Sequence, residues 1–157
     1  MCMHTGAWFV AAAVLLGAGP AAAQSALNWQ RYNVGANSAA ADVPRAVFSE
    51  DAGPAQDGTG RRFASADGRA DLTVQSIDNT RGLSPAAFLA ERNPPPGIIY
   101  RRVTPRFFAV SSIRDGRVWY NRCNRVPGAM NCVLINYPAA EKRKWDAIVT
   151  RISRSLR

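Results

Sequence analysis

The chain has 157 residues and a formal net charge of +9, from 20 Lys and Arg against 11 Asp and Glu. This length suits one domain with one hydrophobic core. The only histidine, His4, lies in an N-terminal segment that we expect to be removed, which excludes Ser-His-Asp, Cys-His and histidine-bearing zinc sites from the remaining domain.

Residues 1–23 have the pattern of a secretory signal peptide. An apolar run over residues 7–16 precedes the helix breakers Gly17, Gly19 and Pro20 and the small residues 21–23. The run is roughly 10 residues long, whereas a membrane-spanning helix needs about 20. We therefore expect cleavage before Gln24 and a single periplasmic or secreted bacterial domain over residues 24–157. An uncleaved anchoring helix is the alternative.

The first half of the domain reads as strands, a hairpin and a short helix. We expect a short strand around Trp29 and Tyr32, a strand or docking segment over residues 46–48, and a solvated loop over residues 49–60. Asp-Gly at positions 67 and 68 predicts a hairpin between residues 61–66 and 69–77. Ser at position 84 followed by Pro predicts a helix over residues 84–92.

The second half predicts four strands and a terminal helix. We expect strands over residues 98–103, 106–113, 117–122 and 132–137, with a second Asp-Gly hairpin at positions 115 and 116. From residue 139 the apolar period becomes helical, and the apolar stripe comprises Trp145, Ile148, Val149, Ile152 and Leu156. The order predicts an α+β fold, a largely antiparallel sheet packed by a short middle helix and an amphipathic C-terminal helix.

Two cysteines remain after cleavage, Cys123 and Cys132, and they flank a Pro-Gly loop between two predicted strands. An even count is typical of an oxidising compartment, so we expect a structural disulfide. The Cys-x-x-Cys spacing of redox-active pairs is absent, which argues against a redox-active site. The remaining alternative is a buried pair of free thiols.

The positive charge is concentrated in the second half. Residues 24–91 hold 6 basic and 8 acidic side chains, and residues 92–157 hold 14 basic and 3 acidic side chains. A half-domain with this excess of positive charge attracts anionic lipid, polyanions or an acidic protein. The arginine excess could equally be general surface charge. No nucleic-acid recognition motif is present, so we expect no nucleic-acid partner.

The order of elements resembles a known fold family. The aromatic pair at positions 29 and 32, the Asp-Val-Pro at positions 42–44, residues 61–70, the helix over residues 84–92 and the final helix resemble small exported proteobacterial proteins with the Mog1/PsbP/DcrB-like α/β/α sandwich. Members of that family act as binding or assembly modules, including an extrinsic photosystem subunit and a small-GTPase partner. The resemblance therefore implies a non-enzymatic module and transfers no functional residue.

Few residues offer catalytic chemistry. A Ser-Lys pair would need Lys142 or Lys144, both in a charge run where lysines stay protonated, and phosphate-loop glycine patterns are absent, so we expect no cofactor. A hydrolase that uses two carboxylates is the alternative function, with candidates Asp42, Asp67, Asp71 and Asp115. Asp67 and Asp115 each precede glycine in a predicted turn, which explains them structurally.

Aromatic and arginine side chains suggest a recognition surface. Strand alternation places Trp119 and Tyr120 on opposite faces, and likewise Phe107 and Phe108. One aromatic surface could then stay open, flanked by arginine; the candidate residues for anion or partner binding are Arg106, Arg117, Arg122 and Trp119. We predict a monomeric, periplasmic, non-enzymatic binding or envelope-associated module, whose partner is a protein or an anionic envelope component. Peripheral binding of the basic terminal helix to an anionic membrane is a further alternative.

Overall fold

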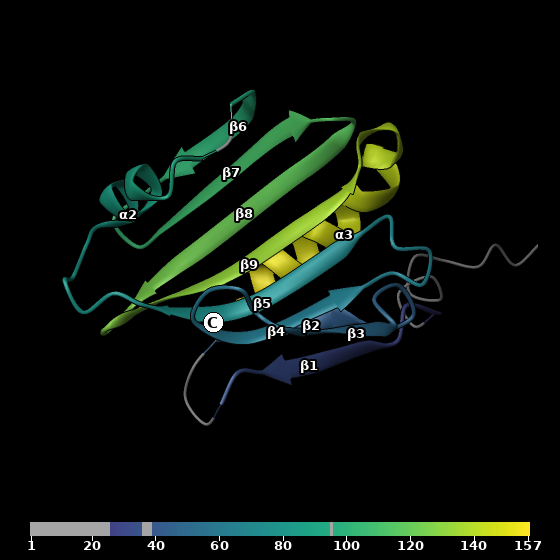
Figure 1. Ribbon diagram of the computed structural model, residues 1–157, viewed down its shortest axis with the longest axis horizontal. Coiled ribbons are helices and arrows are strands. Elements are labelled where there is room, and N and C mark those ends of the chain that lie inside the picture. Colours follow the sequence, from purple (N-terminus) through teal and green to yellow (C-terminus); the bar gives the residue numbers. More distant parts are fainter. Residues whose placement is uncertain (1–25, 36–38, 95) are drawn as a thin grey trace, which may run out of the picture.

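Seven antiparallel strands form one sheet at the centre of the protein (Figure 1). The computed structural model describes residues 26–35, 39–94 and 96–157, so the predicted cleavage site lies outside the described residues. The sheet order is β3-β4-β5-β9-β8-β7-β6, and all neighbours are antiparallel. The strands are β3 (Glu50–Pro54), β4 (Thr59–Ala64), β5 (Asp71–Asp78), β6 (Ile98–Val103), β7 (Phe107–Arg114), β8 (Arg117–Val126) and β9 (Ala129–Pro138).

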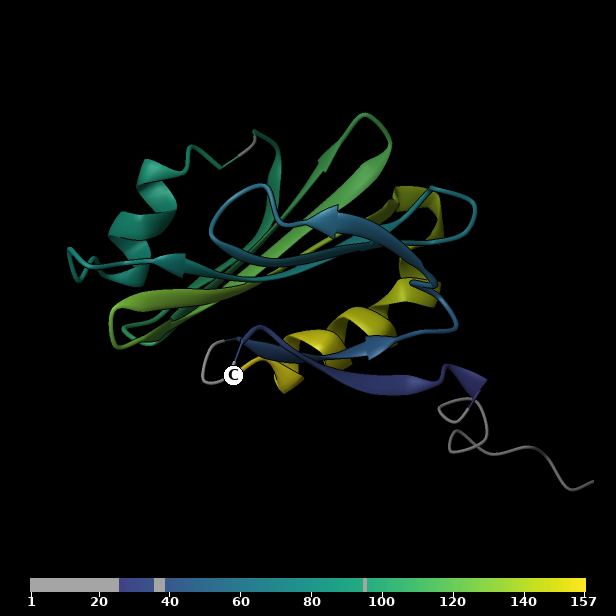
Figure 2. The same cartoon turned by 60° about the horizontal axis from the view of Figure 1, so that its bottom comes forward.

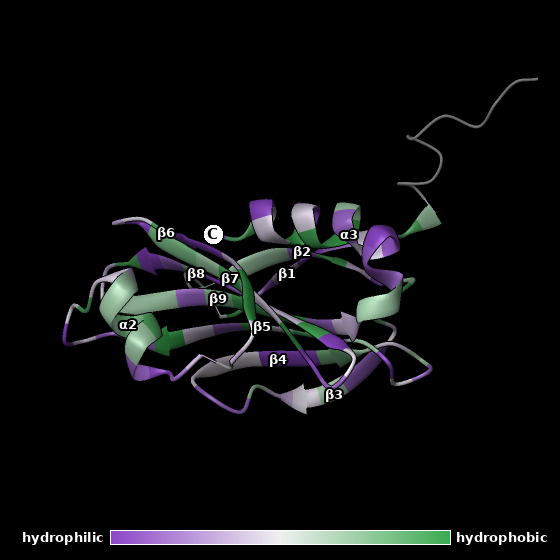
Figure 3. Cartoon of the chain, turned by 90° about the horizontal axis from the view of Figure 1, so that it is seen from above, coloured by the Kyte–Doolittle hydropathy of each residue, from purple (hydrophilic) through white to green (hydrophobic). Residues whose placement is uncertain are grey.

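One face of the sheet, called the α3 face here, is covered by helix α3 (Lys142–Ser155) and by a separate hairpin of β1 (Trp29–Asn33) and β2 (Ala40–Pro44) (Figure 2). The end of the chain fastens these two parts together, because Ala40 and Arg157 exchange two backbone hydrogen bonds of 3.1 and 2.9 Å. The predicted apolar stripe of the terminal helix is buried against the sheet, which confirms that the helix is docked. Hydrophilic residues lie along its outer side (Figure 3).

The main core lies between this layer and the sheet. It joins Phe48, Leu72, Ile135 and Ile152, which are all fully buried. Each such side chain contributes roughly 1.5–3 kcal/mol relative to its exposed state. Trp145 on α3 stacks on Tyr137 of β9, with ring centroids 5.1 Å apart, and so fixes the helix over the middle of the sheet.

Helix α2 (Pro85–Glu91) covers part of the other face, the α2 face (Figure 2). The Ser84 hydroxyl accepts a hydrogen bond of 3.2 Å from the Ala87 amide, and proline occupies the first helical position, as the sequence predicts. Phe88 and Leu89 bury their side chains in a second, smaller core with Phe108. The fold class predicted from the sequence is therefore confirmed.

Both predicted Asp-Gly hairpins are present. At the β7–β8 turn Asp115 and Gly116 have φ of 50° and 70°, and two successive positive values are what a tight type I′ turn requires. The β4–β5 connection is longer than predicted. It spans residues 65–70, because the Ser65 amide bonds to the Ala70 carbonyl and the Ser65 hydroxyl bonds to Asp67.

Of two expectations near the N-terminal side, the loop over residues 49–60 is wrong, and residues 46–48 form the docking segment rather than the strand, with Phe48 fully buried. The second strand lies over Ala40–Pro44 rather than over residues 46–48. After Pro44 the chain turns, since the amides of Val47 and Phe48 both bond to the Pro44 carbonyl, and Phe48 then enters the core. The segment over residues 49–60 is not all loop. It contains β3, an edge strand that tolerates Pro54 because an edge needs only one set of ladder bonds.

Candidate functional site

A groove runs along the α3 face between α3 and the β6–β8 part of the sheet. The cross-strand register explains its floor. Arg102, Ala109 and Arg122 form one row across β6, β7 and β8, and Tyr100, Ser111 and Tyr120 form the next row. In both rows a small residue on β7 is flanked by two large ones. Because side chains in a row stand side by side, this pattern leaves a trough along β7.

Helix α3 forms the wall of this trough. The cavity has a volume of about 540 Å³. We call it the α3 groove, and its lining residues are Ile99, Tyr100, Arg102, Phe107, Ala109, Ser111, Tyr120, Arg122, Tyr137, Lys142, Asp146, Val149, Thr150, Ser153 and Arg154. The Tyr120 hydroxyl joins floor to wall through a 2.6 Å hydrogen bond with the Ser153 hydroxyl.

Positive charge dominates the groove. Lys142 is neutralised by Asp146, whose carboxylate lies 2.8 Å from the ammonium nitrogen. Among the described residues, no carboxylate forms an ion pair with Arg102, Arg122 or Arg154. Three guanidinium groups therefore remain to attract an anion.

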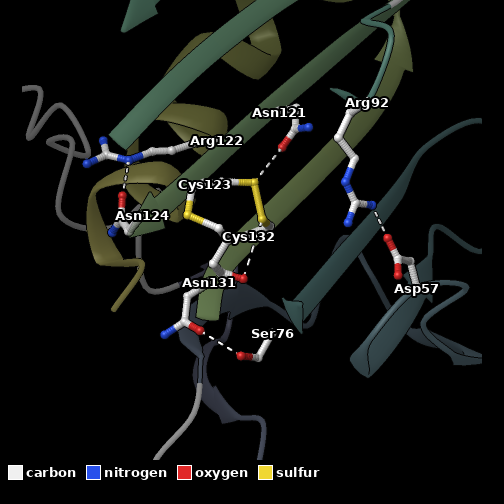
Figure 4. Close-up of a disulfide and its surroundings, with 10 residues drawn as sticks. Asp57, Ser76, Arg92, Asn121, Arg122, Cys123, Asn124, Asn131 and Cys132 are labelled. Atoms are coloured by element: carbon white, nitrogen blue, oxygen red, sulfur yellow. Dashed lines mark hydrogen bonds and ion pairs between the residues drawn. A yellow bond between two sulfur atoms is a disulfide. The ribbon is translucent and has the colours of Figure 1, made fainter. Parts of the chain in front are cut away.

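Two of these guanidinium groups are held by one aromatic ring. Arg102 and Arg122 lie 5.5 and 4.4 Å from the centroid of Phe107. Arg122 also donates a 3.1 Å hydrogen bond to the Asn124 side chain (Figure 4). Contacts of this kind attract a cation to the ring face and restrict its side chain. Two like charges therefore border the same ring, and an anion bound in the groove would offset their repulsion.

The tyrosines add neutral hydrogen-bond donors. Burial raises the pKa of Tyr120, against the opposing effects of its Ser153 hydrogen bond and of Arg122. Burial likewise raises the pKa of Tyr137 to about 12, with help from the nearby Asp146 carboxylate. Both phenols therefore keep their protons at neutral pH. The lining supplies donors and positive charge, which suits the binding of an anion rather than the activation of a nucleophile.

The four residues selected from the sequence are not brought together. Arg122 lies in the α3 groove, whereas Arg117 and Trp119 lie on the α2 face of β8. Positions 117 and 122 are an odd number apart on one strand, so their side chains point to opposite faces. Arg106 lies in the β6–β7 turn, against Asn79, Gly82 and Arg125. The expected single surface around these residues is therefore wrong.

The residues that sequence reasoning missed are Tyr100, Arg102 and Arg154. A signal for the first two exists in the alternation of β6, where Tyr100 and Arg102 share a face. The missing information was the register, which places the small side chains of Ala109 and Ser111 between the two rows.

The predicted disulfide is present. Cys123 and Cys132 face each other directly across β8 and β9, and their sulfur atoms are 2.01 Å apart (Figure 4). The expected loop between them is wrong in length. Both strands continue past the cysteines to a turn at Pro127 and Gly128, because that pair forms a two-residue turn.

The four candidate carboxylates each lie beside an arginine. Asp42 pairs with Arg31, Asp67 with Arg69, Asp71 with Arg117 and Asp115 with Arg114, at 3.0, 2.7, 3.1 and 3.2 Å. The Ser65 hydroxyl and Arg69 hold the pKa of Asp67 well below its usual range. An arginine partner at each of the four acids, and the lowered pKa of Asp67, are typical of carboxylates that hold turns and strands in place.

The two lysines are also engaged in ion pairs. Lys142 pairs with Asp146, and the Lys144 ammonium lies 3.5 Å from Glu141. Among the described residues, no cluster of three or more His, Cys, Asp or Glu side chains could hold a metal ion. In the same part of the chain, no helix has the length and hydropathy needed to span a bilayer.

Comparison with solved structures identifies the fold. The chain is similar to cyanobacterial PsbP (CyanoP) from Synechocystis, with a TM-score of 0.62 and 10% identity over 92% of this chain and 97% of that one. The fold is the Mog1/PsbP-like sandwich. A second similar structure is the Ran-binding protein Mog1p of Saccharomyces cerevisiae, with a TM-score of 0.53 and 11% identity over 83% of this chain and 95% of that one. No protein-family profile and no curated protein sequence matches the chain.

At such low identity the chain shares the Mog1/PsbP-like fold with these two proteins, but few of the amino acids at matching positions are the same. Neither relative supplies a side chain to transfer, so the groove has to be judged on its own geometry.

Proposed function

We propose that this protein is a non-enzymatic binding module of an exported compartment, and that the α3 groove holds an acidic segment of a partner protein. The observation that carries the proposal is the set of three arginines in the groove, Arg102, Arg122 and Arg154, without a carboxylate partner among the described residues. Surfaces that pair arginine with tyrosine and phenylalanine are typical of protein recognition.

The edge strand beside the groove favours an extended protein segment over a lipid headgroup. β6 is the last strand of the sheet, and among the described residues no strand pairs with the other side of its backbone. Ile99 and Tyr100 on this strand are 54% and 47% exposed. A segment that runs along β6 could add backbone hydrogen bonds and apolar contacts to its charge contacts. The yeast protein of this fold is a Ran-binding protein, which supports a protein partner.

The exported location rests on the N-terminal pattern and the disulfide. Residues 1–23 read as a signal peptide, and the Cys123–Cys132 bridge is stable in an oxidising compartment. The carboxylate-dependent hydrolase is disfavoured by the arginine partners of its candidate acids.

Binding of a synthetic acidic peptide tests the proposal. Fluorescence anisotropy would compare a labelled peptide of alternating Glu and Tyr with a Lys and Tyr peptide of the same length. We expect the acidic peptide to bind, and its affinity to fall as salt screens the charges. Arg102→Glu should weaken binding by about tenfold, because each exposed ion pair contributes roughly 0.2–1 kcal/mol and reversal replaces attraction with repulsion.

Arg101→Glu is the matched control, since Arg101 precedes Arg102 on the same strand and faces the opposite side of the sheet. It changes the net charge equally and should leave binding nearly unchanged. Equal losses in the two variants would show that only net charge matters. Binding to phosphatidylglycerol vesicles without binding to the peptide would favour a membrane instead.

A further inference from the structure

The α2 face carries a second cavity that the groove does not explain. It has a volume of about 120 Å³ and lies between the end of α2 and strands β6 to β9. We call it the α2 pocket. Its apolar lining comprises Leu89, Pro94, Ile98, Val110, Trp119 and Leu134, and its polar lining includes Ser112, Asn121 and Asn136. An apolar pocket with few polar groups is typical of a small-molecule site.

The floor of the α2 pocket is one row of the sheet. Ile98, Ser112, Trp119 and Asn136 stand side by side across β6, β7, β8 and β9. The small serine lies between two large apolar side chains, which leaves a depression above it. Ile98 and Trp119 are both 41% exposed, although residues of this size normally bury more of their surface.

Ser112 is the observation that points to a ligand. Its side chain is only 2% exposed, and its hydroxyl has no hydrogen-bond partner among the described residues. A buried hydroxyl without a partner is destabilising, because it has lost its hydrogen bonds to water and gained none. A ligand atom in the pocket would supply the missing bond.

The charged side chain that lines the pocket, Arg92, is paired with a carboxylate. Arg92 forms an ion pair with Asp57 of the β3–β4 loop (Figure 4), and Arg117 pairs with Asp71. Asp71 also accepts a 2.6 Å hydrogen bond from the Asn136 amide group. Since both arginines at this end are neutralised, charge gives an anion no advantage here.

We propose that the α2 pocket binds a neutral, mainly apolar molecule about the size of one six-membered ring, with one hydroxyl or carbonyl group that hydrogen bonds to the Ser112 hydroxyl. Apolar cavities of roughly 150 Å³ accept benzene, so a single ring is the right scale. Trp119 and Ile98 contact the apolar part of the ligand, and the polar group of the ligand lies against Ser112 in the floor of the pocket. The pocket lies on the opposite face from the α3 groove, so the two proposals stand or fall separately.

Phenol and toluene, which are similar in size, test the proposal. In a ¹H–¹⁵N NMR titration of the protein, both should shift the indole signal of Trp119 and the side-chain amide of Asn121 saturably. Ser112→Ala should weaken phenol binding about three- to tenfold, as expected for one hydrogen bond, and leave toluene binding unchanged. Trp119→Ala should weaken both.

Ser111→Ala is the matched control, because Ser111 is the adjacent residue of β7 and borders the α2 pocket, while its side chain lies in the floor row of the α3 groove. It should leave both affinities unchanged. The proposal is overturned if neither probe shifts the pocket signals, or if Ser112→Ala leaves the phenol affinity as it was. It is also overturned if Ser111→Ala has the same effect as Ser112→Ala.

Discussion

Tyr120 on β8 and Ser153 on α3 are joined by a hydrogen bond between their hydroxyl groups, which lie 2.6 Å apart. The bond connects the floor of the α3 groove to its wall. Arg122 lies two residues further along β8 on the same face of the sheet. Its guanidinium donates a 3.4 Å hydrogen bond to the Ser153 hydroxyl. The position of the helix and the position of a groove arginine are therefore set by the same serine.

Removal of the Tyr120 hydroxyl should loosen this connection. We expect Tyr120→Phe to lower the free energy of unfolding by about 1 kcal/mol, because a half-buried hydrogen bond is lost and the ring is kept. Urea denaturation followed by circular dichroism measures the change. Tyr100→Phe is the control, since Tyr100 is 47% exposed and should change stability little. Equal effects of the two substitutions would show that the Ser153 bond contributes nothing.

The Cys123–Cys132 bridge should stabilise the β8–β9 hairpin. It closes a short loop, for which chain entropy predicts about 2.5–3 kcal/mol, so a Cys123→Ala, Cys132→Ala double variant should lose a stability of this order. Mass spectrometry after alkylation in denaturant without reductant should find both cysteines of the wild-type protein unmodified, because unfolding exposes free thiols but leaves a disulfide intact. Alkylation of both cysteines under these conditions would refute the bridge.

Much of the fold could be predicted because its signals are local. The Asp-Gly turns, the Ser84 cap and the apolar stripe of the last helix each need only a few neighbouring residues. Strand β3 was missed because its acidic residues, glycine and proline read as loop. Such residues are tolerated at the edge of a sheet, and a single sequence does not reveal which strand lies at the edge.

The α3 groove could be predicted only in part, because it depends on register between strands. Arg122 was selected from the sequence, but its partner in the same row, Arg102, became evident only once β6 was paired with β7. Arg117 was grouped with Arg122 although alternation alone would have separated them. The unpartnered hydroxyl of Ser112 depends on three-dimensional packing, and no local pattern marks it.

Acid should destabilise the protein through its arginine-bound carboxylates. Bonds from the Ser65 hydroxyl and from Arg69 lower the pKa of Asp67 in the folded state, and Arg69 also lowers the pKa of Glu141. A lowered folded-state pKa gives stability that is present above the unfolded value, about 4, and is lost as the pH falls further. Asp67→Asn should therefore lose less stability than wild type between pH 5 and pH 2, measured by urea denaturation at each pH. An unchanged pH dependence would contradict this role for Asp67.

Alkali should destabilise the protein through Tyr137. Burial raises its pKa to about 12, whereas an unfolded tyrosine titrates near 10. A raised folded-state pKa gives stability that is complete below about pH 10 and is lost as the pH rises toward 12. Tyr137→Phe should lose less stability than wild type between pH 9 and pH 11. If the two proteins lost the same stability over this range, the pKa of Tyr137 would be the same in the folded and unfolded states, which would contradict the prediction.

The most direct test of the central claim is to map where an acidic peptide binds. In a ¹H–¹⁵N NMR titration with a peptide of alternating Glu and Tyr, the account predicts saturable shifts at Ala109, Ser111 and Thr150, which line the α3 groove. Arg154→Glu should weaken these shifts, and Arg143→Glu, on an exposed part of α3 outside the groove, should not. Shifts confined to other faces of the protein, or no saturable shift in the groove, would contradict the account.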